Sequence, residues 1–213
     1  MTIKPILARI ESFPVAGHFT IARGSRTEAR VIRVEIERNG IVGTGECVPY
    51  ARYGETAEGT LAAILAQSPA IAAGMSRAEL QSAMPPGAAR NALDCALWDL
   101  EAPAAGVDVG TLAGLAWPQT MTTAFTISLD TPAAMAAAAA RSAHLPLLKL
   151  KLGAPGDLDR LAAVRAAAPD TRLVVDANEG WGPGDLPDLL KACAQAGVEL
   201  VEQPLPAGQD DVL

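Results

Sequence analysis

Two lysines interrupt a run of leucines, Leu-Leu-Lys-Leu-Lys-Leu, at residues 147–152. Alternate side chains of a β-strand point to the same face, so Lys149 and Lys151 project together and the leucines between them project to the other face. Two ammonium groups on one face of an apolar strand are costly to bury unless negative groups lie opposite them. The stretch therefore predicts a buried strand whose lysines have acidic partners elsewhere in the chain.

Candidate acidic partners follow at regular spacing. Asp176 comes 25 residues after Lys151, and Glu202 comes 26 residues after Asp176. Each interval is about the length of one strand-plus-helix repeat. In a (β/α)8 barrel the carboxyl ends of successive strands converge on one mouth, where the chemistry is done. The spacing predicts that these three residues meet at such a mouth.

The second part of the sequence alternates between strand and helix patterns. Strands are predicted at residues 121–128, 147–152, 173–175 and 198–202, and helices at 157–168, at 185–196 and immediately after Thr131. In the helix at 157–168, Leu158, Leu161 and Val164 are expected to face inward. Strict alternation implies a parallel sheet of the α/β class. Because 97 residues lie from 117 to 213 and a full barrel takes about 250, we expect about the first half of a barrel. Its fourth strand would leave an open apolar edge.

The first 116 residues follow a different pattern. Residues 30–37 alternate between apolar and charged side chains, as in a half-buried strand, and Asn39-Gly40 predicts a type I′ hairpin turn before a returning strand. The other predicted elements are a strand at residues 3–15, loops at 19–27 and 49–55, and helices at 56–65 and 89–100. We therefore expect an α+β capping domain over residues 1–116, followed by the half barrel over residues 117–213.

Composition excludes some function classes. The net charge is −7 and no basic run is present, which argues against nucleic acid and anionic membranes as partners. No stretch reaches the roughly 18 apolar residues of a membrane span, and the first residues lack the apolar run of a signal peptide. The three cysteines lack metal-ligand spacing, as in a reduced cytoplasmic protein.

Carboxylates at neighbouring strand ends suit Mg²⁺, which proteins often hold by one or two acids while substrate and water complete the octahedron. Asp176 and Glu202 are the predicted metal ligands. Asn178 lies two residues beyond Asp176 and either supports the metal site or simply forms a turn. The alternative interpretation is that the two acids are ordinary polar residues at strand ends.

The pair of lysines on one strand face indicates proton-transfer chemistry. A neighbouring ammonium group or burial lowers the pKa of a lysine, which lets it act as a base near neutral pH. We expect Lys151 to transfer the proton and Lys149 to keep it deprotonated; the alternative is a structural ion pair with the acids. Arg23 and Arg26 flank Gly-Ser in a predicted loop and are candidates for binding a substrate carboxylate, although loop arginines are often only solvated.

Together these motifs resemble the enolase superfamily, and within it the muconate lactonizing subgroup. Lys149-Leu-Lys151, Asp176-Ala-Asn178 and Glu202-Gln-Pro204 are similar to the motifs that end the second, third and fourth barrel strands of the family. Residues 92–100 resemble the helix before the barrel. Residues 21–29, 43–55 and 123–128 are most similar to the L-Ala-D/L-Glu dipeptide epimerases, which implies roles in substrate binding for Arg23 and for Thr126.

The resemblance implies a Mg²⁺-dependent isomerase that inverts the α-carbon of the second residue of a dipeptide such as L-Ala-Glu, through an enediolate and 1,1-proton transfer between two lysines. It also implies murein peptide metabolism, a cytoplasmic location and a homo-oligomer. The third metal ligand, the second catalytic lysine and the acids that bind the substrate ammonium group are expected beyond Leu213. We therefore expect the 213 residues alone to be inactive.

Alternative functions remain open at this point. One is a sister reaction of the subgroup: another dipeptide epimerization, N-acylamino acid racemization, o-succinylbenzoate synthesis or cycloisomerization. Another is an inactive fragment with a binding or structural role. A third is a Schiff-base aldolase barrel, which would need no metal carboxylates.

Overall fold

The computed structural model describes residues 4–116 and 120–213, and the chain forms two compact units. The first unit contains Met1–Pro14 and Glu28–Gln119; the second contains Val15–Thr27 and Thr120–Leu213. The predicted domain boundary at residue 117 and the start of the predicted first strand lie outside the described residues. Each unit is therefore considered by itself.

The first unit is built on a three-stranded sheet in the order β1-β2-β3. Its strands are β1 (Leu7–Ile21), β2 (Gly24–Arg38) and β3 (Ile41–Cys47). Strands β2 and β3 are antiparallel, and Asn39 and Gly40 turn between them with φ of +53° and +83°, as a type I′ turn requires. The predicted alternation along β2 is also confirmed, because its isoleucines and valine at 32, 34 and 36 are buried.

The hairpin of β1 and β2 differs from the expectation. The predicted loop at residues 19–27 is wrong, because both strands continue into it and only Ala22 and Arg23 form the turn. Strand pairing satisfies the backbone hydrogen bonds of this polar stretch, although its side chains show no apolar alternation that would have predicted it. The tip of the hairpin, Val15–Thr27, packs with the second unit.

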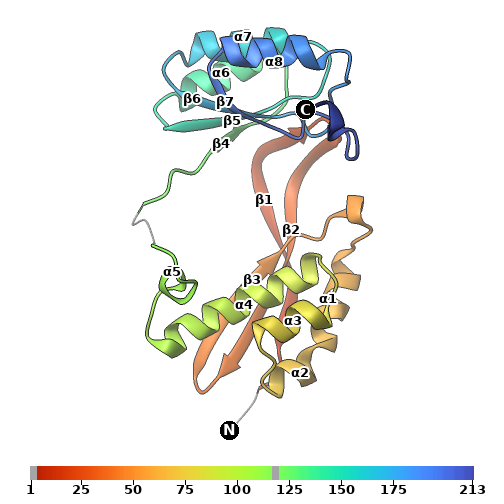
Figure 1. Ribbon diagram of the computed structural model, residues 1–213, viewed down its shortest axis with the longest axis vertical. Coiled ribbons are helices and arrows are strands. Elements are labelled where there is room, and N and C mark those ends of the chain that lie inside the picture. Colours follow the sequence, from red (N-terminus) through yellow and green to blue (C-terminus); the bar gives the residue numbers. More distant parts are fainter. Residues whose placement is uncertain (1–3, 117–119) are drawn as a thin grey trace. The chain divides into compact units, whose positions relative to one another are not determined.

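The helices of the first unit are one 3₁₀ turn and five α-helices among the described residues. They are η1 (Ala51–Tyr53), α1 (Ala57–Ala66), α2 (Ser68–Ala72), α3 (Arg77–Ala83), α4 (Ala88–Ala105) and α5 (Val109–Leu112). Helix α4 packs closely on β3 (Figure 1). A Cβ atom on Gly45 would lie 1.9 Å from the Ala92 carbonyl oxygen, so only glycine fits there.

The second unit contains a parallel sheet in the order β4-β5-β6-β7, which confirms the predicted half barrel. The strands are β4 (Phe125–Ile127), β5 (Leu147–Lys151), β6 (Arg172–Asp176) and β7 (Val198–Glu202). They alternate with α6 (Pro132–Ser142), α7 (Asp157–Ala167) and α8 (Leu186–Gln195), and a 3₁₀ turn, η2 (Asp210–Val212), follows. The three helices cover one face of the sheet (Figure 1).

The leucines that separate the two lysines of β5 form the centre of this core. Leu148, Leu150 and Leu152 are fully buried, as the period of two predicts. In α7 the expectation is partly wrong, because Leu158 is 48% exposed. The inward face of α7 instead begins with Asp157, since a helix of 3.6 residues per turn aligns residues 157, 161 and 164.

The outer strands of this sheet expose apolar side chains. Phe125 of β4 is 49% exposed, and Leu200 of β7 is 53% exposed. Strand β4 is also shorter than the predicted strand at residues 121–128. Within residues 4–116 and 120–213, no helix is both long and apolar enough to cross a membrane.

Candidate active site

The charged residues singled out from the sequence lie at the carboxyl ends of adjacent strands. Lys151, Asp176 and Glu202 are the last residues of β5, β6 and β7. The strand register pairs Lys151 with Asp176, and Asp176 with Glu202. Because the three strands are parallel, these ends lie along one edge of the sheet.

The two lysines and the two acids form one cluster. Lys149 Nζ donates a hydrogen bond to Glu202 and lies 3.3 Å from Asp176 Oδ2. Lys151 Nζ lies 2.5 Å from the same oxygen. The lysines therefore form ion pairs with the acids, as the alternative interpretation expects. Neither lysine extends into solvent, because the side chain of Lys149 is 23% exposed and that of Lys151 is 10% exposed.

The cluster shifts the pKa of two of its members. Burial lowers the pKa of Lys149, but its hydrogen bonds to Glu202 and Asp176 and their negative charges outweigh burial and raise the pKa above its usual value. The carboxylates therefore favour the charged ammonium form of Lys149. Burial raises the pKa of Asp176, but hydrogen bonds from Lys151 and Asn178 hold it below its usual range.

The chain turns sharply after β6. Asn178 and Glu179 both have positive φ, at +49° and +64°. The buried Asn178 donates from its backbone nitrogen to Asp176 Oδ1 at 2.9 Å and from Nδ2 to Oδ2 at 3.2 Å. Its own Oδ1 atom is buried without a hydrogen-bond partner in the described part of the chain. An unsatisfied buried oxygen is rare and points to a water or ion that completes the site.

The tip of the β1–β2 hairpin contributes residues to the same region. Arg23 donates to the carbonyl oxygen of Asn178 and lies 3.5 Å from Glu179 Oε2. The Phe19 ring centroid is 5.7 Å from Lys151 Nζ. Phe19 and Glu179 were not predicted, because no spacing or charge pattern marks them. Only the fold of the hairpin brings Phe19 to the lysine.

Thr126, expected from the resemblance, is half-buried on β4 and pairs with Lys149 in the strand register. Across the ranges 4–116 and 120–213, no group of three or more His, Cys, Asp and Glu residues could hold a metal ion. The predicted metal site therefore consists here of the pair Asp176 and Glu202, which share Lys149.

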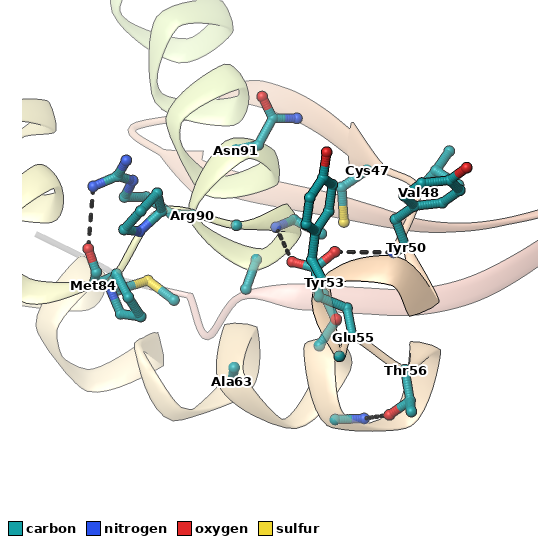
Figure 2. Close-up of a pocket in the computed structure, with 18 residues that line it drawn as sticks. Cys47, Val48, Tyr50, Tyr53, Glu55, Thr56, Ala63, Met84, Arg90 and Asn91 are labelled. Carbon is teal, nitrogen blue, oxygen red and sulfur yellow. Dashed lines mark hydrogen bonds between the residues drawn. The ribbon is translucent and has the colours of Figure 1, made fainter. Parts of the chain in front are cut away.

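A separate cavity lies in the first unit. Its volume is about 850 Å³. Its polar lining residues include Tyr50, Tyr53 and Glu55 (Figure 2). Glu55 closes the loop at its rim, because its carboxylate accepts from the backbone nitrogens of Tyr50 at 2.9 Å and of Ala88 at 2.6 Å. None of the predicted site residues lines this cavity.

Comparison with known proteins agrees with the geometry. Residues 7–114 match the mandelate racemase / muconate lactonizing enzyme N-terminal domain, and residues 132–213 match the enolase C-terminal domain-like family. The L-Ala-D/L-Glu epimerase of Escherichia coli is 47% identical over 205 residues, which cover 95% of this chain and 64% of the relative.

Two crystal structures are also similar. An enolase family member from Agrobacterium tumefaciens with homology to dipeptide epimerases, with bound sodium and L-Ala-L-Glu, has a TM-score of 0.91 and 51% identity, over 97% of this chain and 63% of that one. A dipeptide epimerase from Enterococcus faecalis complexed with Mg and L-Leu-L-Tyr has a TM-score of 0.86 and 33% identity, over 97% of this chain and 62% of that one. This chain thus spans less than two thirds of each relative. It belongs to the mandelate racemase / muconate lactonizing enzyme family of the enolase superfamily.

Proposed function

We propose that the full-length protein carrying this chain is a Mg²⁺-dependent dipeptide epimerase of the L-Ala-D/L-Glu type, which inverts the α-carbon of the second residue. The observation that carries the proposal is the cluster of two lysines and two carboxylates at three consecutive strand ends. Removing an α-proton needs a base beside the carbon and positive charge beside the substrate carboxylate. The cluster supplies groups of both kinds.

The residues present fit a magnesium ion. Lys149 Nζ contacts both Asp176 and Glu202, so the two carboxylates are close enough to share one cation. The unpartnered Oδ1 of Asn178 offers a further oxygen beside them. Asp176 and Glu202 would hold the ion, with Asn178 in support, which matches the few carboxylates by which proteins bind Mg²⁺. When bound, the ion would act as a Lewis acid on the substrate carboxylate and favour the enediolate.

Lys151 would remove or return the α-proton on one face of the substrate. Its position supports this role, because the side chain is buried at the strand end and lies 2.5 Å from Asp176 Oδ2. Lys149 would lie on the same strand face, beside the two carboxylates. Arg23, on the hairpin tip, would bind the side-chain carboxylate of a second-residue Glu, and Thr126 would line the site from β4.

We further propose that residues 1–213 by themselves do not turn over a dipeptide. The described residues offer two clustered metal carboxylates, whereas Mg²⁺ requires near-ideal octahedral coordination. An epimerase also needs an acid on the face opposite its base. A cytoplasmic location, a role in murein peptide metabolism and homo-oligomeric assembly stay predictions; light scattering on the purified full-length protein would test the last.

The test is an exchange experiment on the full-length protein. L-Ala-L-Glu and L-Ala-D-Glu are incubated in deuterated buffer with Mg²⁺, and the α-proton of the Glu residue is followed by NMR. We expect both epimers to lose this proton and to interconvert, and we expect chelation by EDTA to stop both processes. Exchange confined to N-acylated amino acids would instead assign one of the sister reactions. The absence of exchange in every such substrate would reject the proposal.

A further inference from the structure

Asp157 is a buried carboxylate that the proposed reaction does not use. It is the first residue of α7, and 4% of it is exposed. Its Oδ2 atom accepts hydrogen bonds from Gly153 N at 2.7 Å, from Ala154 N at 3.1 Å and from Trp181 Nε1 at 2.8 Å. A carboxylate with this many donors is held in one position.

The donors belong to the two loops that leave the candidate active site. Gly153 lies two residues after Lys151, and Trp181 lies five residues after Asp176. One oxygen atom of Asp157 therefore joins the loop after β5 to the loop after β6. The same two strands carry the lysine and the acid that lie 2.5 Å apart.

No side chain separates these two loops. A Cβ atom on Gly153, whose φ is +101°, would lie 2.1 Å from the Ala177 carbonyl oxygen. A Cβ atom on Gly180 would lie 2.4 Å from the Gly153 carbonyl oxygen. Because backbone rests directly on backbone, a shift of the loop after β5 displaces the loop after β6 as well. The hydrogen bonds from Gly153, Ala154 and Trp181 to Asp157 hold the two loops together.

Arg160 extends the connection to a third strand end. Its guanidinium group donates to Asp157 Oδ1 at 3.0 Å and to the Pro155 carbonyl oxygen at 2.7 Å. Its Nε atom donates to the carbonyl oxygen of Asp130, in the loop after β4, at 2.7 Å. Asp157 and Arg160 thus link the loops that follow three consecutive strands.

We propose that Asp157 is a positioning residue for Lys151, and this inference rests on the proposed function. Its carboxylate fixes the first turn after β5, and so fixes where the Lys151 amine stands relative to the substrate α-carbon. Proton transfer depends steeply on such placement, and an error of about 1 Å can reduce the rate about 100-fold. Asp157 acts through Gly153 and Ala154 and does not itself transfer a proton.

The test compares two aspartates in the first turn of α7. Asp157→Asn keeps the size of the side chain but replaces one acceptor oxygen with a donor, which faces either Arg160 or the backbone nitrogens. The matched control is Asp159→Asn, which removes the same charge from the same helix turn at an exposed position. Trp181→Phe leaves Asp157 itself unchanged and removes the indole donor, together with part of a buried ring.

The full-length protein is measured for α-proton exchange from each epimer of L-Ala-Glu, for kcat and KM, and for thermal unfolding. The indole N–H signal of Trp181, assigned by its absence in Trp181→Phe, reports the hydrogen bond independently of activity. In Asp157→Asn we expect this signal to shift and its hydrogen exchange to accelerate. We expect the rate of α-proton exchange to fall about 10- to 100-fold, mainly for the epimer served by Lys151. The kcat/KM values for epimerisation should fall by one common factor in both directions, because the equilibrium constant between the epimers is unchanged.

Asp159→Asn should behave as the wild-type protein, and Trp181→Phe should lose part of the exchange rate with the same preference for one epimer. Equal loss of exchange from both epimers, or the same loss in Asp159→Asn, would overturn the positioning role in favour of a purely structural one. If Asp157→Asn does not fold, the epimer preference of Trp181→Phe decides. Failure of the proposed function is distinguishable, because the wild-type protein would then exchange neither epimer.

Discussion

Lys151 Nζ lies 2.5 Å from Asp176 Oδ2, although 25 positions separate the two residues in the sequence. Each is the last residue of its strand, and the strands are paired in register. A parallel sheet therefore converts a repeat length in the sequence into a contact between an amine and a carboxylate. The first predictions concern this contact and its neighbours.

Replacing Lys151 with Met should remove α-proton exchange from one epimer of L-Ala-Glu and leave exchange from the other, because the proposed partner lysine serves the opposite face. Deuterium incorporation measured by NMR on each purified epimer checks this. Lys191→Met, on the exposed surface of α8, is the matched control and should change neither rate. Undiminished exchange from both epimers would exclude Lys151 as the base.

Asp176→Asn and Glu202→Gln should each abolish Mg²⁺-dependent turnover while the protein stays folded, because each removes one of few charged ligands. Titration of activity with Mg²⁺, together with circular dichroism, measures both effects. Glu199→Gln changes an acid on the same strand β7 that pairs with Arg172 instead, and it should leave the Mg²⁺ dependence intact. Near-normal turnover in Asp176→Asn or Glu202→Gln would remove that residue from the metal site.

Arg23→Ala should lower kcat/KM for L-Ala-L-Glu far more than for a dipeptide with an apolar second residue. A charge-assisted hydrogen bond contributes roughly 1.5–3 kcal/mol, which corresponds to a loss of about 10- to 150-fold. Arg30→Ala, on β2 and paired with Glu58, should show no such preference between substrates. If Arg23→Ala lowers kcat/KM equally for both dipeptides, Arg23 does not bind the side-chain carboxylate of the Glu residue.

Glu55→Ala should destabilise the first unit, because the loop at the cavity rim loses two hydrogen bonds from backbone nitrogens to one carboxylate (Figure 2). Hydrogen bonds to charged groups contribute roughly 1.5–3 kcal/mol, so urea unfolding should show a loss of about that size. Glu58→Ala, in the following helix α1, changes an acid that is exposed and paired with Arg30. A loss in Glu58→Ala as large as in Glu55→Ala would contradict this account of the loop.

At pH 8 an alkylating reagent should modify Cys95 before Cys47 and Cys193. Burial raises the thiol pKa of Cys47 and of Cys193 to about 11, and the thiolate is the reactive form. Burial also raises the thiol pKa of Cys95, but its side chain is exposed. Peptide mapping by mass spectrometry gives the order of modification, and early labelling of Cys193 would contradict it.

The same shifts predict a loss of stability at alkaline pH. In the unfolded chain these thiols ionise near pH 8.5. The stability that their raised folded-state pKa contributes is therefore fully present below that pH. It is lost as the pH rises from about 8.5 toward 11, because the unfolded chain then releases protons that the folded protein retains. Unfolding by urea at pH 7.5 and at pH 10 checks the direction.

The sequence predicted the half barrel and the cluster because both depend on local periods. The lysines of β5 are two residues apart, which places them on one face, and each acid ends an apolar stretch one repeat further on. These signals require no knowledge of distant contacts. Positions of single elements were also predictable where a residue has one favourable geometry, as Asn39-Gly40 and the N-cap Thr131 show.

What the sequence could not predict depends on long-range packing. Nothing in the polar stretch around Phe19 shows that it continues as paired strands or that it meets residues 128, 151 and 178. Leu158 was expected inside α7 because it is apolar, yet Asp157 takes the inward position since three donors from two loops compensate its charge. The raised pKa of Lys149 follows from the distances to the acids, which the spacing alone does not give.

The hairpin of β1 and β2 has a consequence for recombination between relatives. Residues 15–27 are encoded within the first unit but pack with the second, where Leu129 N donates to the Thr20 carbonyl oxygen at 3.1 Å. A chimaera with a single crossover near residue 117 would therefore set a hairpin tip from one parent against a sheet from the other. Crossovers at 14/15 and 27/28 as well would keep each tip with its own sheet. Genes of this architecture should thus tolerate exchange at these three crossovers, which divide the chain into four segments, better than exchange of two halves.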